Sequence, residues 1–487
     1  MKIATRRKYD LKKSLHNFLL IKPGEWRLFA LMFSVASLVN INFNVLRSMR
    51  NALVVADAKG SASFIPYFEF FGTFPAAILL TWGLSRLMRT FSLKHIFALT
   101  MAFFLLFFLL FPVAIHPHKE VVRLFLEKSF GPSPFFYKWT DLLFYIMAEL
   151  WKIALLSVLF WGFINQRLPY ESAKRLYPPM MLGNSIGALL AGPITVLCAS
   201  ELIYRVAPLA SDRWLHSLYA LTAALILCGL LTLLLFNSLW GLLGTNSRVD
   251  KAKERVPFTR RLLSLSSSVR YMAQSPYLLA MLFIVVAEYV SYALGELIFL
   301  EVLKERFPLP ADYCKYLGTL TTWTGLLIAF FAIFLTPFLL RTYRWGYSAM
   351  LTPILMVVMT CSFFAAVHFG KTSLLAGPAQ LTFIVLLGSL HFCIGRATKY
   401  TIFDTTKELA FIPLSEEAQV KGKLVIDGIG SRFGRGSSSL ISIGLFHFIG
   451  GPSESVIFAG IIAVTFALFM VPAARLVSRD FEKMQPT

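Results

Sequence analysis

The rest of the chain is organised around RATKYTIFDTTKELAFIPLSEEAQVKGKLVIDGIGSRFGRGS (Arg396–Ser437). The apolar run PAQLTFIVLLGSLHFCI (378–394) leads into it, and SLISIGLFHFI (439–449) follows it. Charges inside or beside membrane helices are costly, so a chain that retains several is expected to use them. We therefore expect the cations of this stretch to hold a polyanion partway across a membrane. The charged side chains on which this expectation rests are Arg396, Lys399, Asp404, Lys407, Lys421, Lys423, Asp427, Arg432 and Arg435.

The composition is that of a polytopic membrane protein. Of the 487 residues, 57% are hydrophobic and 15% are charged, whereas soluble domains are nearer half apolar and a quarter charged. A net charge of +21 would indicate nucleic acid on a soluble chain, but cytoplasmic loops of membrane proteins also collect Lys and Arg. We expect topology to explain most of the excess, and no nucleic-acid partner. The five cysteines have no metal or redox spacing, so neither a metal nor a cofactor is expected.

About twelve segments are long and apolar enough to cross a bilayer, which takes about twenty residues. The residues before the first span and the even-numbered gaps, which carry Arg86, Arg167 and Arg341, are basic and predict cytoplasmic N- and C-termini. The N-terminus has no apolar core until about Arg27, so no signal peptide is expected. The expected spans lie near 27–46, 64–83, 95–115, 141–165, 178–200, 215–240, 277–300, 318–340, 347–368, 378–403, 424–449 and 453–476.

The longest polar interruption is NSRVDKAKERVPFTRRLLSLSSSVR (Asn246–Arg270). A basic central loop between two six-helix halves is the layout of a major-facilitator-like transporter, in which the site lies near the midplane between the halves. We therefore predict an all-α membrane protein with an N-terminal half (1–245), a basic cytoplasmic linker (246–275) and a C-terminal half (276–487).

Ionisable residues inside the expected spans are the first candidates for a site. Glu149 and Lys152 share a helical face, where they form either a private ion pair or part of the site. Glu296, without a cation nearby in the sequence, is a candidate for proton coupling or for holding a cation across the bundle. Arg47 and Arg50 are three apart and suit phosphate oxygens, unless they reach toward the membrane surface.

The stretch at 396–437 repeats this spacing. Arg396, Lys399, Phe403 and Lys407 share a helical face, and Arg432 and Arg435 lie three apart in a glycine-rich helix. The glycines permit close helix approach or local unwinding, as at transporter sites. GSRFGRGSS lacks the GK[ST] of a phosphate-binding loop, and the chain contains no HExxH or GxSxG pattern, so it is not expected to be an enzyme.

Several blocks resemble the nucleotide transporter family that includes the ATP/ADP translocases of obligate intracellular bacteria and plastids. The most specific is FDTTKELAFIPLSEEAQVKGK (403–423), which is similar to the family's FD-TKE-AYIPL-E---VKGK signature. The resemblance covers nearly the whole chain in order. The other similar blocks are LRSMRNALVV (46–55), FYIMAELW (144–151), LLSVLFWGFINQ (155–166), SAKRLYPPM (172–180) and FPLPADYCKYLGTLTTWTG (307–325).

The resemblance implies transport of a nucleotide by alternating access between the two halves. It carries over Arg50, where the family usually has Lys, together with Glu149, Glu296 and Lys407. The basic residues are expected to meet phosphates, and the carboxylates to balance them or to couple transport. Asn51 replaces the family's acid and Lys152 replaces a small residue, which changes the charge around the expected site.

We therefore expect a nucleotide transporter in a bacterial inner membrane, a monomer among membrane lipids, that exchanges ATP and ADP or takes up nucleoside phosphates. The alternatives are a proton-coupled nucleoside triphosphate symporter, an NAD/ADP exchanger, and, from another class, a membrane phosphotransferase that uses the same cations. The expected phosphate contacts are Arg50, Lys399, Lys407, Arg432 and Arg435. The expected counter-charges or coupling residues are Glu149, Glu296 and Lys152. The aromatic side chains expected to stack on a base are Tyr145, Tyr400 and Phe403.

Overall fold

The computed structural model describes residues 21–57, 59–130, 138–180, 182–243, 270–372 and 377–484, and within these ranges every regular element is helical. Ten helices in the described ranges are long and apolar enough to cross a membrane. The two further expected spans, 178–200 and 424–449, are also largely helical, but one contains only a short apolar helix and the other is polar. The predicted all-α membrane protein with about twelve spans is therefore confirmed.

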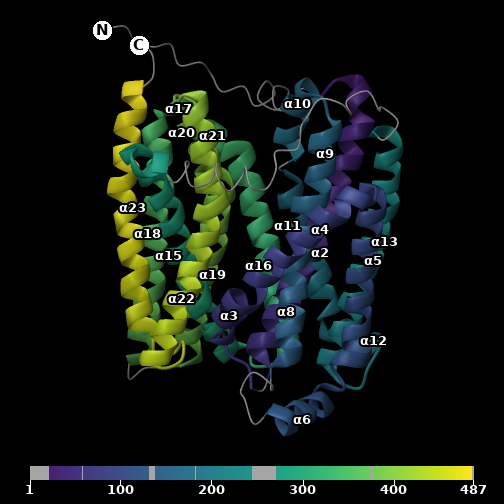
Figure 1. The fold of residues 1–487 in the computed structure, drawn as a ribbon. Helices are drawn as coiled ribbons and strands as arrows, with labels where there is room; N and C mark the ends of the chain where they lie inside the picture. The colour runs from purple at the N-terminus through teal and green to yellow at the C-terminus, as the bar shows by residue number, and fades with distance from the viewer. Residues whose placement is uncertain are drawn as a thin grey trace.

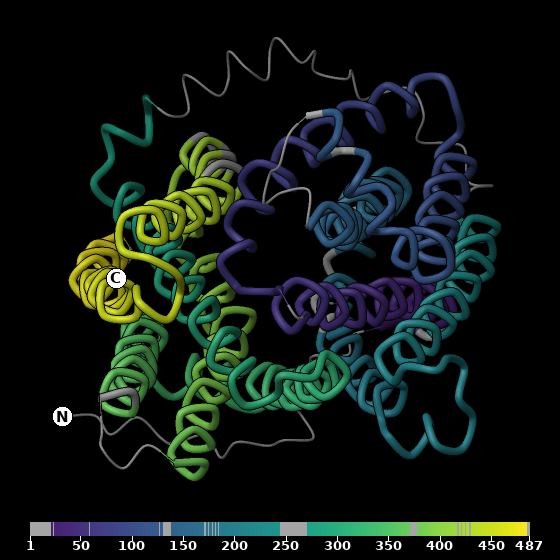
Figure 2. Tube along the Cα trace, turned by 90° about the horizontal axis from the view of Figure 1, so that it is seen from below, coloured from purple at the N-terminus to yellow at the C-terminus, as the bar shows by residue number. Residues whose placement is uncertain are grey.

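The helices of the first part of the chain gather on one side of the molecule, drawn purple to teal in Figures 1 and 2. Several of them continue into π-helical segments, named η here, while η1 is a 3₁₀ turn. In order they are η1 (Pro23–Glu25), α2 (Trp26–Asn51), η2 (Ala52–Ala56), α3 (Phe64–Tyr67), η3 (Phe68–Thr73), α4 (Phe74–Thr90), α5 (Leu93–Leu110), η4 (Phe111–Ile115), α6 (Lys119–Phe130), α8 (Trp139–Trp151), η5 (Lys152–Phe160), α9 (Trp161–Arg167), α10 (Tyr170–Met180), α11 (Leu182–Cys198), α12 (Glu201–Val206) and α13 (Arg213–Leu243).

The helices of the second part, green to yellow, gather on the other side. They are α15 (Pro276–Arg306), α16 (Pro310–Phe330), η6 (Phe331–Leu335), α17 (Thr336–Thr342), α18 (Trp345–Thr372), α19 (Pro378–Thr398), η7 (Lys399–Phe403), α20 (Asp404–Phe411), α21 (Glu416–Lys423), η8 (Leu424–Gly430), α22 (Ser431–Phe448) and α23 (Val456–Met484).

The two groups meet most closely where α11 packs against α16, because glycines let the backbones approach. A Cβ atom on Gly192 would lie 2.6 Å from the carbonyl oxygen of Gly318, and one on Gly325 would lie 2.6 Å from the backbone nitrogen of Leu189. Small residues at such crossings replace side-chain volume with backbone contact, the usual solution for helices packed within a membrane.

Polar contacts also join the two groups at the end of the molecule where α12 lies (Figure 1). The Lys304 ammonium donates to the carbonyl of Gly60 at 2.6 Å, and Glu301 accepts from the backbone nitrogen of Ala62 at 2.6 Å. Arg213, at the start of α13, pairs with Asp312 at 2.6 Å. The first two bonds hold the C-terminal end of α15 against the segment that follows η2, and the third joins α13 to α16.

The structure corrects one expected boundary. The helix expected over 378–403 continues without a break through η7 and α20 to Phe411. In the segment expected over 178–200, α10 reaches Met180 and α11 starts at Leu182, and the residue between them lies outside the described residues. Most of the expected linker, 246–275, lies outside the described residues, so the division into two halves at that point stays a prediction.

Candidate functional site

A cavity of about 450 Å³, partly open to solvent, lies between the two groups of helices, at the C-terminal end of α2 and in the C-terminal half of α15. Its wall combines charged, hydroxyl and apolar side chains from both groups. The lining residues are Arg47, Arg50, Asn51, Ile65, Pro66, Glu69, Tyr145, Ala293, Glu296, Leu297, Leu300, Ser438, Ser439 and Ser442.

On the N-terminal side, Glu149 of α8 is the centre of the first charged cluster. It forms a buried ion pair with Arg50 of α2. Arg435 of α22, on the opposite side, comes within 3.7 Å of the other carboxylate oxygen, yet its side chain is 56% exposed. The first contact is therefore enclosed, while the second belongs to a cation that solvent can reach.

Tyr145 packs against this cluster and links it to Glu69. The guanidinium of Arg50 lies 4.2 Å from the centre of its ring, and its hydroxyl donates to Glu69 at 3.1 Å. Ser439 of α22 donates to the other oxygen of Glu69, also at 3.1 Å. The Tyr145 ring is fully buried, so it is engaged by the protein on its face and at its hydroxyl.

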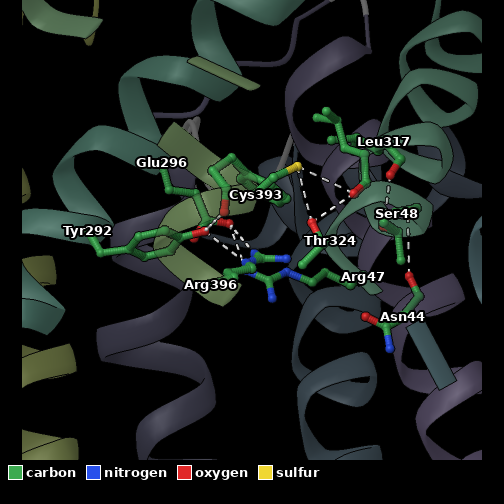
Figure 3. A network of polar contacts seen from close by, with 12 residues as sticks. Asn44, Arg47, Ser48, Tyr292, Glu296, Leu317, Thr324, Cys393 and Arg396 are labelled. Atoms are coloured by element: carbon green, nitrogen blue, oxygen red, sulfur yellow. Dashed lines mark hydrogen bonds and ion pairs between the residues drawn. The ribbon is translucent and has the colours of Figure 1, made fainter. Parts of the chain in front are cut away.

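On the C-terminal side, Glu296 of α15 is the centre of the second cluster, shown in Figure 3. One of its oxygens, Oε1, accepts from Arg47 at 2.7 Å and from Arg396 at 2.9 Å. Arg396 also donates through Nε to the hydroxyl of Tyr292 at 2.8 Å and lies 3.8 Å from the ring centre of Phe392. Arg47 belongs to the N-terminal group, so Glu296 joins the two groups.

A third pair lies on the same two continuous helices. Glu288 precedes Glu296 on α15 by about two turns, and Lys399, in η7, follows Arg396 by about one turn. The Lys399 ammonium donates to Glu288 at 2.6 Å and lies 3.4 Å from the ring centre of Tyr289. Tyr400, the next residue along the chain after Lys399, is 51% exposed. The ring of this tyrosine is therefore accessible, and it follows a cation of the third pair.

The three clusters nearly neutralise themselves. As ionised groups, the four carboxylates are Glu69, Glu149, Glu288 and Glu296, and the five cations are Arg47, Arg50, Arg396, Lys399 and Arg435. A single positive charge is left over. An anion with several charges must therefore compete with the protein's own carboxylates, or share their cations.

Most of the helices that carry these charges also contain a π-helical segment beside them. The segments η2, η3, η5, η7 and η8 follow, contain or precede charged residues of the site, whereas α15 is a regular α-helix throughout. A π-helical turn inserts one residue and re-aims the side chains around it, and it frequently occurs at functional sites. The sequence patterns did not reveal these segments.

The structure brings some of the expected site residues together and separates others. Arg50, Glu296 and Tyr145 line the cavity, and Glu149 and Arg435 are joined to it through Arg50. Lys399 pairs with Glu288, which lies on the same helix as Glu296, and Tyr400 follows Lys399 in the chain. Lys407 is instead paired with Asp427 at 2.7 Å and lines a second, mostly apolar pocket together with Phe403, which is buried. Arg432 is exposed and has no ion-pair partner within the described part of the chain.

The private ion pair considered for Glu149 and Lys152 does not form. Glu149 faces Arg50 and Arg435 instead, while the Lys152 ammonium lies 4.7 Å from the ring centre of Phe43. Arg47 and Arg396 were noted in the sequence as members of basic pairs but were not among the expected phosphate contacts, and Tyr292 was not considered. The first two are each three residues from a selected cation, and this spacing was the available signal.

Comparisons with known proteins identify related sequences. The family described as TLC ATP/ADP transporter matches residues 5–481. ADP,ATP carrier protein 1 of Chlamydia trachomatis serovar D is 30% identical over 455 residues, which cover 90% of this chain and 85% of that protein. ADP,ATP carrier protein 1, chloroplastic, of Arabidopsis thaliana is 30% identical over 463 residues, which cover 91% of this chain and 72% of that protein.

Solved structures resemble the fold. A mutant of the nucleoside transporter NupG superposes with a TM-score of 0.54 at 13% identity, covering 94% of this chain and 100% of that chain. The D-xylose-proton symporter superposes with a TM-score of 0.52 at 14% identity, covering 95% of this chain and 97% of that chain. At these identities the likeness concerns the fold alone, and it confirms the major-facilitator-like arrangement.

Proposed function

Because the chain belongs to the TLC ATP/ADP transporter family, we propose that it carries nucleoside phosphates across a membrane, with ATP and ADP as the first candidates. The observation that supports this most directly is a cavity lined by side chains of both groups of helices, with Arg47 and Arg50 in its wall and with Arg396 and Arg435 paired to carboxylates beside it. A substrate held between two groups that move relative to each other is the arrangement required by alternating access.

Within the cavity, we propose Arg50 and Arg435 as phosphate contacts, with Lys399 nearby. A polyphosphate offers oxygens to several cations at once, and arginine forks match that geometry. Arg435 is the most available of the three, because it is more than half exposed and only loosely held by Glu149. Lys407 and Arg432 stay predictions from the sequence, since their positions in this structure do not support the same role.

We propose that Tyr400 stacks on the base. Its ring is half exposed and follows a cation of the third pair, whereas the ring of Tyr145 is covered by Arg50 and that of Phe403 is buried in the second pocket. Stacking needs an accessible ring face. Glu149 and Glu296 act as the counter-charges of the arginines, and Lys152 has no assigned partner in this proposal.

We propose a bacterial inner membrane as the location, with both termini in the cytoplasm. The short helices α10, α20 and α21 lie at one end of the molecule, and α6 and α12 lie at the other (Figure 1). The first end contains the gaps in which basic residues such as Arg167 and Arg341 gather, as expected for the cytoplasmic side.

Exchange and net uptake differ in what they require. Exchange of nucleotides of similar charge needs no other ion, whereas net uptake of a multiply charged anion against a negative interior needs protons or another driving ion. We propose exchange, because the cations of the site are nearly balanced by carboxylates. A leaving nucleotide and an arriving one therefore bind to a site with the same small net charge.

The test is uptake of labelled ATP, ADP, other nucleoside triphosphates and NAD by bacterial cells that express the chain. Exchange predicts that uptake requires a preloaded counter-substrate and survives an uncoupler. Uptake that an uncoupler abolishes would favour the proton-coupled symporter, and uptake of NAD would favour the NAD/ADP exchanger. If purified protein transfers phosphate from labelled ATP and no uptake occurs, the phosphotransferase alternative is correct.

A further inference from the structure

Glu296 holds two arginines with a single oxygen. Arg47 and Arg396 both donate to its Oε1, at 2.7 Å and 2.9 Å, and they come from opposite groups of helices. Neither guanidinium uses two donors on the carboxylate in this arrangement, although the paired, two-bond contact is the strongest that a guanidinium makes with an anion. The Nε of Arg47 is buried and has no hydrogen-bond partner.

An unused donor at this position is informative. Burying an N–H without a partner costs free energy, because its bond to water is lost and not replaced, so such groups are uncommon where no ligand or water satisfies them. Arg50, which lines the same cavity, has the same unpartnered Nε. Two arginines on one face of α2 thus keep donors free beside a cavity of about 450 Å³.

Resting on the proposed function, we propose that Glu296 occupies the place of a substrate phosphate in the empty transporter, and that a nucleotide phosphate displaces it to bind Arg47 and Arg396. A phosphate group presents several oxygens in place of the one that Glu296 uses, so it can satisfy both forks together. The two arginines then become phosphate contacts in addition to Arg50 and Arg435, and the substrate takes over the link between the two groups of helices.

The charge balance of the site supports the replacement of Glu296 by a phosphate group. With Glu296 in place, the five cations of the site face four carboxylates, and little attraction for a polyanion remains. Moving Glu296 away releases two largely enclosed cations, with Arg396 8% exposed and Arg47 21% exposed. When the nucleotide leaves, the carboxylate returns to the arginines, so Glu296 weakens binding and speeds release.

The experiment compares Glu296→Gln with the unaltered full-length protein in lipid nanodiscs, using labelled ADP and ATP. Gln keeps the size of the side chain but removes the competing charge, so we expect nucleotide affinity to rise about tenfold, while exchange in proteoliposomes slows. Unlabelled inorganic pyrophosphate should compete more strongly in the variant, since the contest is for phosphate oxygens. Glu201→Gln, at an exposed ion pair on α12, is the matched control and should change neither measurement.

Arg47→Gln and Arg396→Gln complete the test. Each should lower nucleotide affinity about tenfold, and each should cancel the gain when combined with Glu296→Gln. If Glu296→Gln does not fold, Glu296→Asp replaces it, because a shorter carboxylate cannot reach both guanidinium groups and should also tighten binding.

Two results contradict the inference, and they are distinguishable. Unchanged or weaker nucleotide binding by both Glu296 variants, with normal binding by the unaltered protein, overturns the displacement and leaves the proposed function standing. Absence of any nucleotide binding by the unaltered protein overturns both.

Discussion

Each group of helices supplies one carboxylate that two arginines share, one from its own group and one from the other. Glu149 has Arg50 on its own side and Arg435 opposite, whereas Glu296 has Arg396 on its own side and Arg47 opposite. The contact across the interface is 3.7 Å long in the first cluster and 2.7 Å in the second. In the N-terminal cluster, Arg435 is therefore available to a ligand. In the C-terminal cluster, Glu296 holds both Arg396 and Arg47 closely.

Arg50→Ala should have the largest effect, because it removes the closer of the two arginines that pair with Glu149 among the described residues. A buried carboxylate that loses its ion-pair partner costs about 3–5 kcal/mol of stability, and nucleotide transport should fall to background. Arg47→Ala should cost less, since Glu296 retains Arg396. Thermal unfolding in detergent and uptake in proteoliposomes measure the two effects. Equal losses of stability in the two variants would remove the difference between the clusters.

The residues that precede the two carboxylates test how each is positioned. Gly295 precedes Glu296, and a Cβ atom there would collide with the buried ring of His391, which stacks between Tyr292 and Phe363. Gly295→Ala should therefore cost about 1–3 kcal/mol and disturb nucleotide binding. The matched change in the other cluster, Ala148→Gly, should cost about 1–2 kcal/mol through helix propensity and the loss of one buried methyl group, with no collision. Thermal unfolding of both variants provides the comparison, and a neutral Gly295→Ala would contradict it.

Arg435→Ala should separate transport from stability. The arginine is more than half exposed and loosely paired, so its loss should change the free energy of unfolding by less than about 1 kcal/mol. Loss of a charged hydrogen bond to phosphate should lower nucleotide affinity about tenfold. Equilibrium binding of labelled ADP and thermal unfolding are the two measurements. A large fall in stability with normal binding would show that Arg435 supports the fold rather than the substrate.

Hydropathy and charge were sufficient to predict the fold of this chain, because long apolar runs leave helices as the stable solution in a membrane. The polar helix α22 was found as well, since its cations follow a glycine-rich helical pattern. The site was predicted in part from the cost of burying charge in a membrane. Arg50, Glu149 and Glu296 lie in apolar segments, where ionised side chains are rare unless they have a function.

The partners of these charges could not be predicted from the sequence. Glu149 has Lys152 three residues away but pairs with Arg50, which is 99 residues distant in the chain. Lys407 matches the most specific block of the resemblance, yet it pairs with Asp427 across the turn between α20 and α21. Spacing identifies residues that share a face of one helix, whereas the choice of partner depends on how helices pack.

The two clusters can also be compared at the N-terminal ends of α2, which carries Arg47 and Arg50, and of α15, which carries Glu296. At the start of α2, a hydrogen bond from Arg175 is the main cause that lowers the pKa of Glu25 from its ordinary 4.5 to about 2. A lowered pKa stabilises the fold above pH 4.5 and loses this contribution as the pH falls toward 2. The difference in unfolding temperature between the unaltered protein and Arg175→Met should therefore shrink over that range. The start of α15 is capped by Ser275, which accepts from the backbone nitrogen of Leu278 at 3.4 Å, so Ser275→Ala should cost about 1 kcal/mol at every pH. A difference for Arg175→Met that does not change with pH would show that Glu25 anchors α2 without its charge.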